Sequence, residues 1–105
     1  MNLTEFKEKL SSYKRKDLIF TSHAEIQAIF REIDLEEVKE NILYPTKLVY
    51  FEEQDSGNSL SKKYNCYFEY TNRLAHRYIL ALNEKVIIVT IIKINREWQR
   101  TIRKK

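Results

Sequence analysis

The stretch Leu18-Ile19-Phe20-Thr21-Ser22-His23-Ala24 contains the point at which a strand gives way to a helix. Its apolar run predicts a short strand over residues 17–21. Thr21-Ser22 is a favourable N-cap pair, and Glu25 follows Ser22 by three residues, as in a capping box. We therefore expect a short strand that leads directly into a helix over residues 22–32.

The helix over residues 22–32 carries three polar side chains on one face. His23 lies in its first turn, and Gln27 and Arg31 follow at i+4 and i+8. An imidazole that titrates near neutral pH, an amide and a permanent cation together suit a phosphate group. The apolar side chains that this helix offers to the core are those of Ala24, Ile26, Ile29 and Phe30.

Two more helices flank this junction. Before it, an apolar residue recurs every three or four positions in residues 2–14, which predicts an amphipathic helix. After it, Asp34 is placed to cap a third helix, with Glu37 at the capping-box position. The third helix ends before Pro45, and its expected core residues are Leu35, Val38 and Ile42.

After Pro45 the apolar pattern has a period of two, which predicts strands. We expect strands over residues 47–51, 64–70, 77–82 and 85–94, and a short helical segment after Asn95. Helices followed by a meander of strands are typical of an α+β fold. The predicted architecture is one domain, with N-terminal helices packed on one face of a four- to five-stranded antiparallel sheet. If the second face is open, it carries Tyr67, Glu69 and Arg77, or the equivalent register.

The composition fits a globular protein of 105 residues, 43% hydrophobic and 32% charged. The single cysteine, Cys66, excludes an intrachain disulfide and a cysteine-rich zinc site. Because there are only two histidines and no clustered carboxylates, we expect no metal and no other cofactor. No apolar run has the length of a membrane span and the N-terminus is polar, so we expect a cytoplasmic protein.

The net charge of +4 is concentrated at the C-terminal end. Residues 93–105 hold six basic residues and one acidic residue, whereas residues 1–92 hold 13 basic and 14 acidic residues. A basic tail suits a polyanion such as RNA, and a solvated helix end is an equally good interpretation. Trp98 lies among Arg96, Arg100 and Arg103, an arrangement that suits RNA. The alternative is that Trp98 docks the last segment onto the sheet.

Several of these features together resemble a family of small domains of unknown function with a His-Ala…Arg-x-Ile signature. They are Phe20-Thr21-Ser22-His23-Ala24, Arg31-Glu32-Ile33, Glu36-Glu37-Val38 and Tyr44-Pro45, with Tyr64, Arg77 and Val89-Thr90 in the strands. That family is similar to the RelE-like and BrnT-like ribonuclease toxins of type II toxin–antitoxin systems. The resemblance covers most of residues 17–95, and leaves residues 1–16 as an N-terminal helix and residues 96–105 as a basic tail. Gln27 stands where many members carry Arg.

The resemblance implies a RelE- or barnase-like fold and a metal-independent endoribonuclease that cuts RNA by attack of the 2′-hydroxyl. His23 or His76 would move protons, and Arg31 and Arg77 would hold the phosphate. Tyr67 would stack on a base or act as a weak acid. The basic tail would hold the RNA backbone, and an acidic antitoxin protein would be the partner. Arg73, near His76 and Arg77 in the sequence, would add to the RNA contacts.

Each of these residues also has a structural interpretation. His23 can hydrogen-bond a neighbouring carbonyl, and Arg31 can pair with a sheet carboxylate such as Glu69. Tyrosines at strand spacing, Tyr67 included, are common core residues. A second hypothesis is therefore a non-catalytic module of the same fold that binds RNA or a protein. The enzyme hypothesis requires His23, Arg31, Arg77 and a sheet tyrosine to converge on one concave surface.

Overall fold

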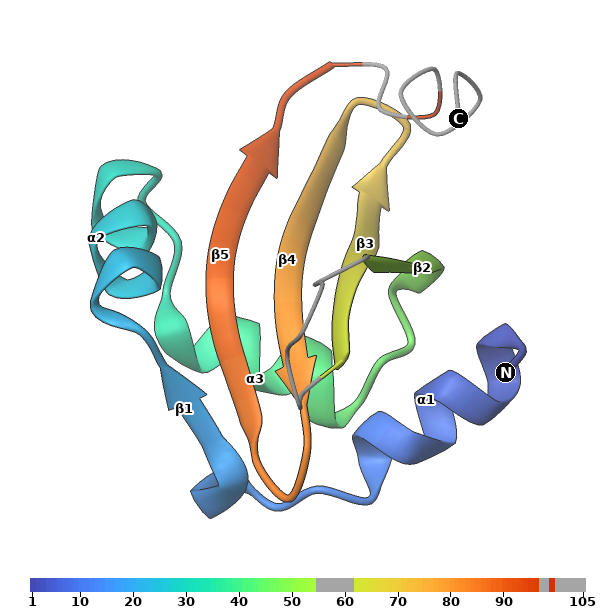
Figure 1. The fold of residues 1–105 in the computed structure, drawn as a ribbon. Coiled ribbons are helices and arrows are strands. Elements are labelled where there is room, and N and C mark those ends of the chain that lie inside the picture. The colour runs from blue at the N-terminus through green and yellow to red at the C-terminus, as the bar shows by residue number, and fades with distance from the viewer. Residues whose placement is uncertain (55–61, 97–98, 100–105) are drawn as a thin grey trace.

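The computed structural model describes residues 1–54, 62–96 and 99 (Figure 1). In chain order its elements are α1 (Leu3–Ser11), the 3₁₀ turn η1 (Arg15–Asp17), β1 (Leu18–Phe20), α2 (Ser22–Phe30), α3 (Leu35–Leu43), β2 (Leu48–Gln54), β3 (Lys62–Thr71), β4 (Leu74–Leu82) and β5 (Val86–Ile94). This order of helices and strands confirms the expected α+β fold. Trp98, Arg100 and Arg103 of the basic tail lie outside the described residues.

The five strands form one sheet in the order β1-β5-β4-β3-β2. The four strands from β2 to β5 are antiparallel neighbours, as expected for a meander. β1 is different, because it runs parallel to β5 and pairs with residues 86–88. The sheet is therefore mixed rather than wholly antiparallel. A parallel pair needs a long crossover rather than a hairpin, and here α2, α3 and the meander supply it.

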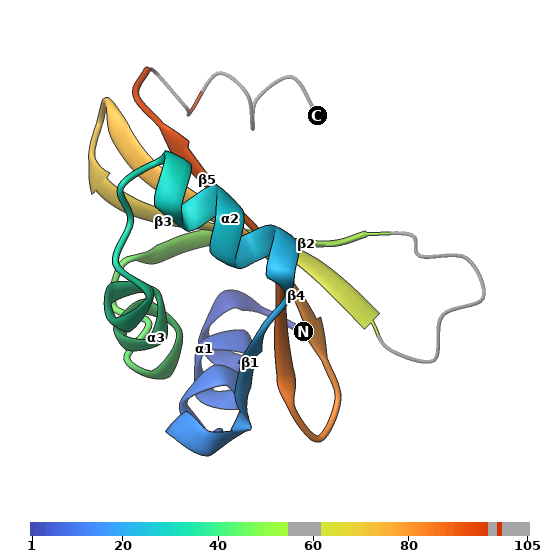
Figure 2. The same cartoon turned by 90° about the vertical axis from the view of Figure 1, so that its left-hand side faces the viewer.

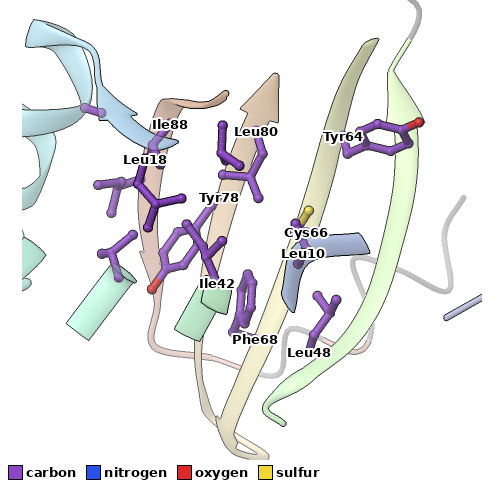
Figure 3. Packing of buried hydrophobic residues seen from close by; sticks show 14 of the residues in the cluster. Leu10, Leu18, Ile42, Leu48, Tyr64, Cys66, Phe68, Tyr78, Leu80 and Ile88 are labelled. Atoms are coloured by element: carbon purple, nitrogen blue, oxygen red, sulfur yellow. The ribbon is translucent and has the colours of Figure 1, made fainter. Parts of the chain in front are cut away.

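The helices α1 and α3 cover one face of the sheet (Figures 1 and 2). Leu10 of α1 and Ile42 of α3 are fully buried in the same cluster as Phe68 and Tyr78 from the strands (Figure 3). Cys66 lies in this cluster too, and burial raises the pKa of its thiol. Residues 1–16 thus contribute to the one main core of the protein.

The packing of α2 corrects the prediction about its core residues. Only Ala24 and Ala28 are buried, whereas Ile26, Ile29 and Phe30 are 53%, 76% and 81% exposed. The reason is the neighbour of this helix, since α2 lies beside β5 where β1 has ended (Figures 1 and 2). The small side chains of Ala24 and Ala28 let α2 approach β5 closely. The larger apolar side chains of Ile26, Ile29 and Phe30 remain exposed on the rest of the helix surface.

The start of α2 is also one residue earlier than the capping box requires. Thr21 is the N-cap, and its Oγ1 accepts a hydrogen bond from the Ala24 N–H at 3.0 Å. The residue three positions after the cap is then Ala24 rather than Glu25, so the predicted capping box is wrong. His23 nevertheless lies in the first turn, as expected.

α1 and α3 both lie on one side of the sheet, and we call the opposite face the open face (Figure 2). Side chains alternate along a strand. Cys66 and Phe68 point to the main core, whereas Tyr67 packs in a separate small cluster with Ala75 and Ile94. The prediction that Tyr67, Glu69 and Arg77 share this second face agrees with the register.

Candidate functional site

Two neighbouring rows of side chains cross the open face from β2 to β5. The strand register puts Tyr50, Tyr67, Arg77 and Ile92 in one row, and Glu52, Asn65, Ile79 and Thr90 in the next. A carboxylate, an amide and a guanidinium thus lie on adjacent rows of one surface. These side chains form the candidate site on the open face.

The carboxylate of Glu52 is held by two neighbours. Its Oε2 accepts a hydrogen bond from Tyr50 Oη at 3.2 Å, and its Oε1 accepts one from Asn65 Nδ2 at 3.2 Å. Asn65 is almost fully buried, and its own Oδ1 has no hydrogen-bond partner. These contacts fix the position of the carboxylate on the open face.

Arg77 is the most informative residue of this surface. It is half-buried, and its Nε is buried with no hydrogen-bond partner. Its guanidinium makes no ion pair with any described residue. A guanidinium is always charged, and buried charges are normally paired. Among the residues that the structure describes, Arg77 is therefore a cation that the sheet positions and that no carboxylate pairs.

Tyr67, the cross-strand neighbour of Arg77, is fully buried. Its ring packs edge-on against Tyr50, with 5.8 Å between ring centroids. A ring with no exposed face cannot stack on a base, so its position favours the core interpretation. The half-exposed aromatic residue in this row is Tyr50.

His76 lies on the opposite face from Arg77, which corrects the prediction that these two neighbours form one cluster. It is 3% exposed, its ring packs on Tyr70 and its Nδ1 lies 2.7 Å from Tyr78 Oη. Side chains alternate in β4, so consecutive residues cannot serve one surface. Burial is the main cause that lowers the pKa of His76.

A hydrogen-bonded network joins α3 to the inner face of the sheet around His76. Asn41 Nδ2 donates to Tyr70 Oη at 2.8 Å and to Tyr78 Oη at 2.9 Å, and Tyr70 Oη donates to Glu37. Burial and the Glu37 carboxylate raise the pKa of Tyr70 to about 12, so its hydroxyl stays protonated. Because Tyr78 accepts from Asn41, its proton is free to be donated to His76 Nδ1. This network orders the core and lies away from the open face.

Gln27 has a structural partner at the edge of β5. Its Oε1 accepts a hydrogen bond from the Ile91 N–H at 2.8 Å. Thr21 contacts the same edge nearer the start of β5. Its N–H donates a hydrogen bond to Ile88 O at 3.1 Å, and its Oγ1 donates one to Val89 O at 3.2 Å. The amide oxygen at position 27 therefore completes the hydrogen bonding of β5 beyond the end of β1. An arginine has no acceptor for this position.

The other two residues of the predicted polar face, His23 and Arg31, lie on opposite sides of Gln27. At 100° per residue, Ala24, Ala28 and Arg31 are turned to one side of Gln27, toward the core, and His23 and Phe30 are turned to the other, toward the open face. Arg31 is half-buried and has no ion pair with Glu69 or another described residue. His23 is exposed.

Of the predicted site residues, the structure thus brings Arg77 and His23 to the open-face side, while His76 and Tyr67 are buried and Arg31 faces the core side. Arg73 is exposed in the turn between β3 and β4, and Arg96 is exposed after β5. The full convergence that the enzyme hypothesis requires is not formed by these residues. Glu52 and Asn65, which sequence reasoning missed, lie in the row of side chains next to that of Arg77.

Other possible sites lie apart from this surface or are absent from the described residues. A hollow of about 620 Å³ lies between α1 and the turn from α3 to β2, and includes Lys7, Tyr44 and Pro45. It contains none of the predicted site residues. Within residues 1–54 and 62–96, no three His, Cys, Asp or Glu side chains gather to hold a metal ion. No helix among the described residues has the length and apolar character to cross a membrane.

Comparisons with protein-family models, curated proteins and solved structures found no match to this chain. The resemblance to RelE-like and BrnT-like toxins therefore stays a prediction.

Proposed function

We propose that the protein is a metal-independent endoribonuclease of the RelE-like toxin type, and that RNA binds on the open face of its sheet. Because His23, Arg31 and Arg77 do not converge, the proposal gives the proton transfers to Glu52 and Tyr50 in place of the histidines. The observation that carries the proposal is the half-buried guanidinium of Arg77, which has no partner among the described residues. A phosphodiester is the anion that a guanidinium fork matches best in RNA. The resemblance of the sequence to ribonuclease toxins supports the same ligand.

The chemistry needs a base, a group that stabilises charge on phosphorus and an acid. The 2′-oxygen attacks phosphorus, the bond to the 5′-oxygen breaks, and the products are a 2′,3′-cyclic phosphate and a 5′-hydroxyl. Glu52 would take the proton of the 2′-hydroxyl, and Arg77 would stabilise the charge on the phosphoryl oxygens. Tyr50 would give its proton to the leaving 5′-oxygen and regain one from Glu52, with which it shares a hydrogen bond.

The spacing supports this assignment of roles. Glu52 and Arg77 lie two strands and one row apart, so their Cα atoms are separated by about 12 Å. Both side chains are long, and Glu52 is drawn toward Asn65 on the strand between them. A phosphodiester placed above Asn65 can therefore contact both groups.

The alternative function is a module of the same fold that binds RNA or a protein without cleaving RNA. One observation favours it, namely that neither histidine side chain projects from a strand onto the open face. His76 is buried on the inner side, and His23 is on α2.

The test is cleavage of a labelled single-stranded RNA in the presence of EDTA by the wild type and three variants. Arg77→Ala and Glu52→Gln should each lower the rate by about a hundredfold or more. Lys9→Ala removes the same charge from the exposed side of α1, which covers the other face of the sheet, and should leave the rate within about threefold. Thermal unfolding of each variant establishes that it is folded. If the wild type bound RNA without cleaving it, the result would select the alternative function. If the wild type neither bound nor cleaved RNA, both functions would be refuted for RNA.

A further inference from the structure

We propose that Phe30 of α2 stacks on an unpaired base of the RNA strand whose phosphate is held by Arg77, so that the substrate is single-stranded. This inference rests on the proposed function and extends its site from the sheet onto α2. It concerns binding rather than cleavage, so it holds for both the enzyme and an RNA-binding module.

The exposure of Phe30 is the first observation. Its side chain is 81% exposed, more than any other large apolar side chain of the described residues. An exposed apolar helix face alone fits many partners. What selects an RNA base here is the position of Phe30 relative to the guanidinium of Arg77, which has no partner within the described part of the chain.

Phe30 and Arg77 lie at the same height along β5. Gln27 is level with Ile91, to which it is hydrogen-bonded. Thr21, just before α2, bonds Val89, so α2 advances in the same direction as β5. Three more helical residues rise about 4.5 Å, which equals between one and two strand residues. Phe30 is therefore level with Ile92 and Lys93, and Ile92 is the cross-strand partner of Arg77.

Phe30 also lies on the correct side of α2. Ala24 and Ala28 are turned from Gln27 by about 60° and 100° toward the main core, and a right-handed helix then turns Phe30 by about 60° the other way. That direction leads to the open face, beyond Ile92. The row that begins at Tyr50 and passes through Arg77 thus continues onto the ring of Phe30.

The distance fits one continuous RNA strand. β4 and β5 are about 4.8 Å apart and a packed helix lies about 10 Å from its neighbour, so the two Cα atoms are about 15 Å apart. The side chains of Phe30 and Arg77 shorten this gap to the span of one or two nucleotides. Both faces of a base are covered by its neighbours in a duplex, and only a single strand can offer a base to an aromatic side chain.

The experiment measures the affinity of a fluorescent 2′-O-methyl RNA 12-mer, which cannot be cleaved because its 2′-oxygens are blocked. The same strand annealed to its complement is the duplex probe. Phe30→Ala should weaken binding of the single strand by about tenfold and leave weak duplex binding unchanged. Phe30→Trp should restore the affinity, whereas Phe30→Leu, which keeps apolar area without a ring, should not.

The matched control is Ile29→Ala. Ile29 is 76% exposed on the same helix, but it is turned away from the open face. Both variants change exposed side chains, so both should fold, and the control should bind the single strand as the wild type does.

Three results would overturn the inference. They are an unchanged affinity in Phe30→Ala, an equal affinity in Phe30→Leu and Phe30→Trp, and equal wild-type binding of single strand and duplex. A dimer of the wild type that Phe30→Ala dissociates, with RNA affinity unchanged, would assign Phe30 to a second copy of this chain. Loss of binding in Arg77→Ala but not in Phe30→Ala would refute this inference alone. A wild type that binds neither probe would refute the proposed function.

Discussion

The side chain of Gln27 closes the edge of β5, because its Oε1 accepts a hydrogen bond from the N–H of Ile91 at 2.8 Å. β1 is only three residues long and pairs with residues 86–88. Beyond that point, α2 replaces a strand as the neighbour of β5. This contact sets the position of α2, and with it the positions of His23 and Phe30 beside the open face.

The first prediction concerns this contact. Gln27→Ala and Gln27→Arg should each lower the free energy of unfolding by about 1–2 kcal/mol, since both leave the Ile91 N–H without its acceptor. Urea unfolding followed by circular dichroism measures the change. Glu25→Ala, an exposed substitution on the same helix, should change it by less than about 0.5 kcal/mol. If Gln27→Arg were as stable as the wild type, this role of the amide oxygen would be contradicted.

The second prediction concerns the end of α2, where Glu32 has a φ of 54°. The Ile33 N–H bonds Ala28 O at 2.9 Å and the Glu32 N–H bonds Ile29 O at 3.2 Å, which is the Schellman pattern. Glycine adopts this conformation without strain, so Glu32→Gly should raise the free energy of unfolding by about 0.5–1 kcal/mol. Glu32→Ala, which keeps the Cβ atom, should give no such gain.

The third prediction concerns the pH dependence of stability. Burial lowers the pKa of His76 in the folded state, opposed by Glu37 and assisted by Lys93. The unfolded chain then binds more protons, so stability is full above the unfolded pKa of about 6.5 and falls as the pH is lowered through it. The slope that one such group adds is at most about 1.4 kcal/mol per pH unit.

His76→Gln should therefore lose less stability than the wild type between pH 7.5 and 5.5, although it starts from a lower value. His23→Gln, at the other and exposed histidine, is the control substitution. Thermal unfolding at a series of pH values measures both. An identical pH dependence of the wild type and His76→Gln would exclude His76 as the cause.

The fourth prediction concerns α1, which packs Phe6 into the main core, fully buried and stacked on Phe51 with 4.1 Å between ring centroids. Phe6→Ala should lower the free energy of unfolding by about 3–5 kcal/mol. Lys9→Ala, on the exposed side of α1, should have little effect. A small effect of Phe6→Ala would mean that residues 1–16 are an appendage rather than part of the core.

The helices and strands could be predicted because each signal is local. Asp34 was expected to cap α3, and its side chain accepts a hydrogen bond from the Glu36 N–H at 2.9 Å. The packing of α2 could not be predicted in this way, because its periodicity does not reveal that its neighbour is the edge of one strand. The periodicity of α2 therefore predicts that Phe30 lies in the core, whereas its side chain is exposed.

The candidate site was partly hidden by the expected ends of two strands. The sequence pattern predicts that β2 ends at Phe51 and that Glu52 lies in a loop, whereas the strand continues to Gln54. The sequence pattern predicts that β4 begins at Arg77, whereas the strand begins at Leu74 and includes His76. Successive side chains of a strand point to opposite faces, so His76 and Arg77 are separated, which the predicted strand start does not indicate. Strand ends depend on pairing with a neighbour, which one stretch of sequence does not show.

The central claim is that Arg77 holds an RNA phosphate on the open face. Its most direct test is the affinity of the single-stranded 2′-O-methyl RNA for the wild type, Arg77→Ala and Lys9→Ala, measured at several salt concentrations. Arg77→Ala should bind about tenfold or more weakly, with a slope of log K against log salt reduced by about 0.7, and Lys9→Ala, on the other side of the sheet, should follow the wild type. Equal affinities and equal slopes for the wild type and Arg77→Ala would contradict the claim.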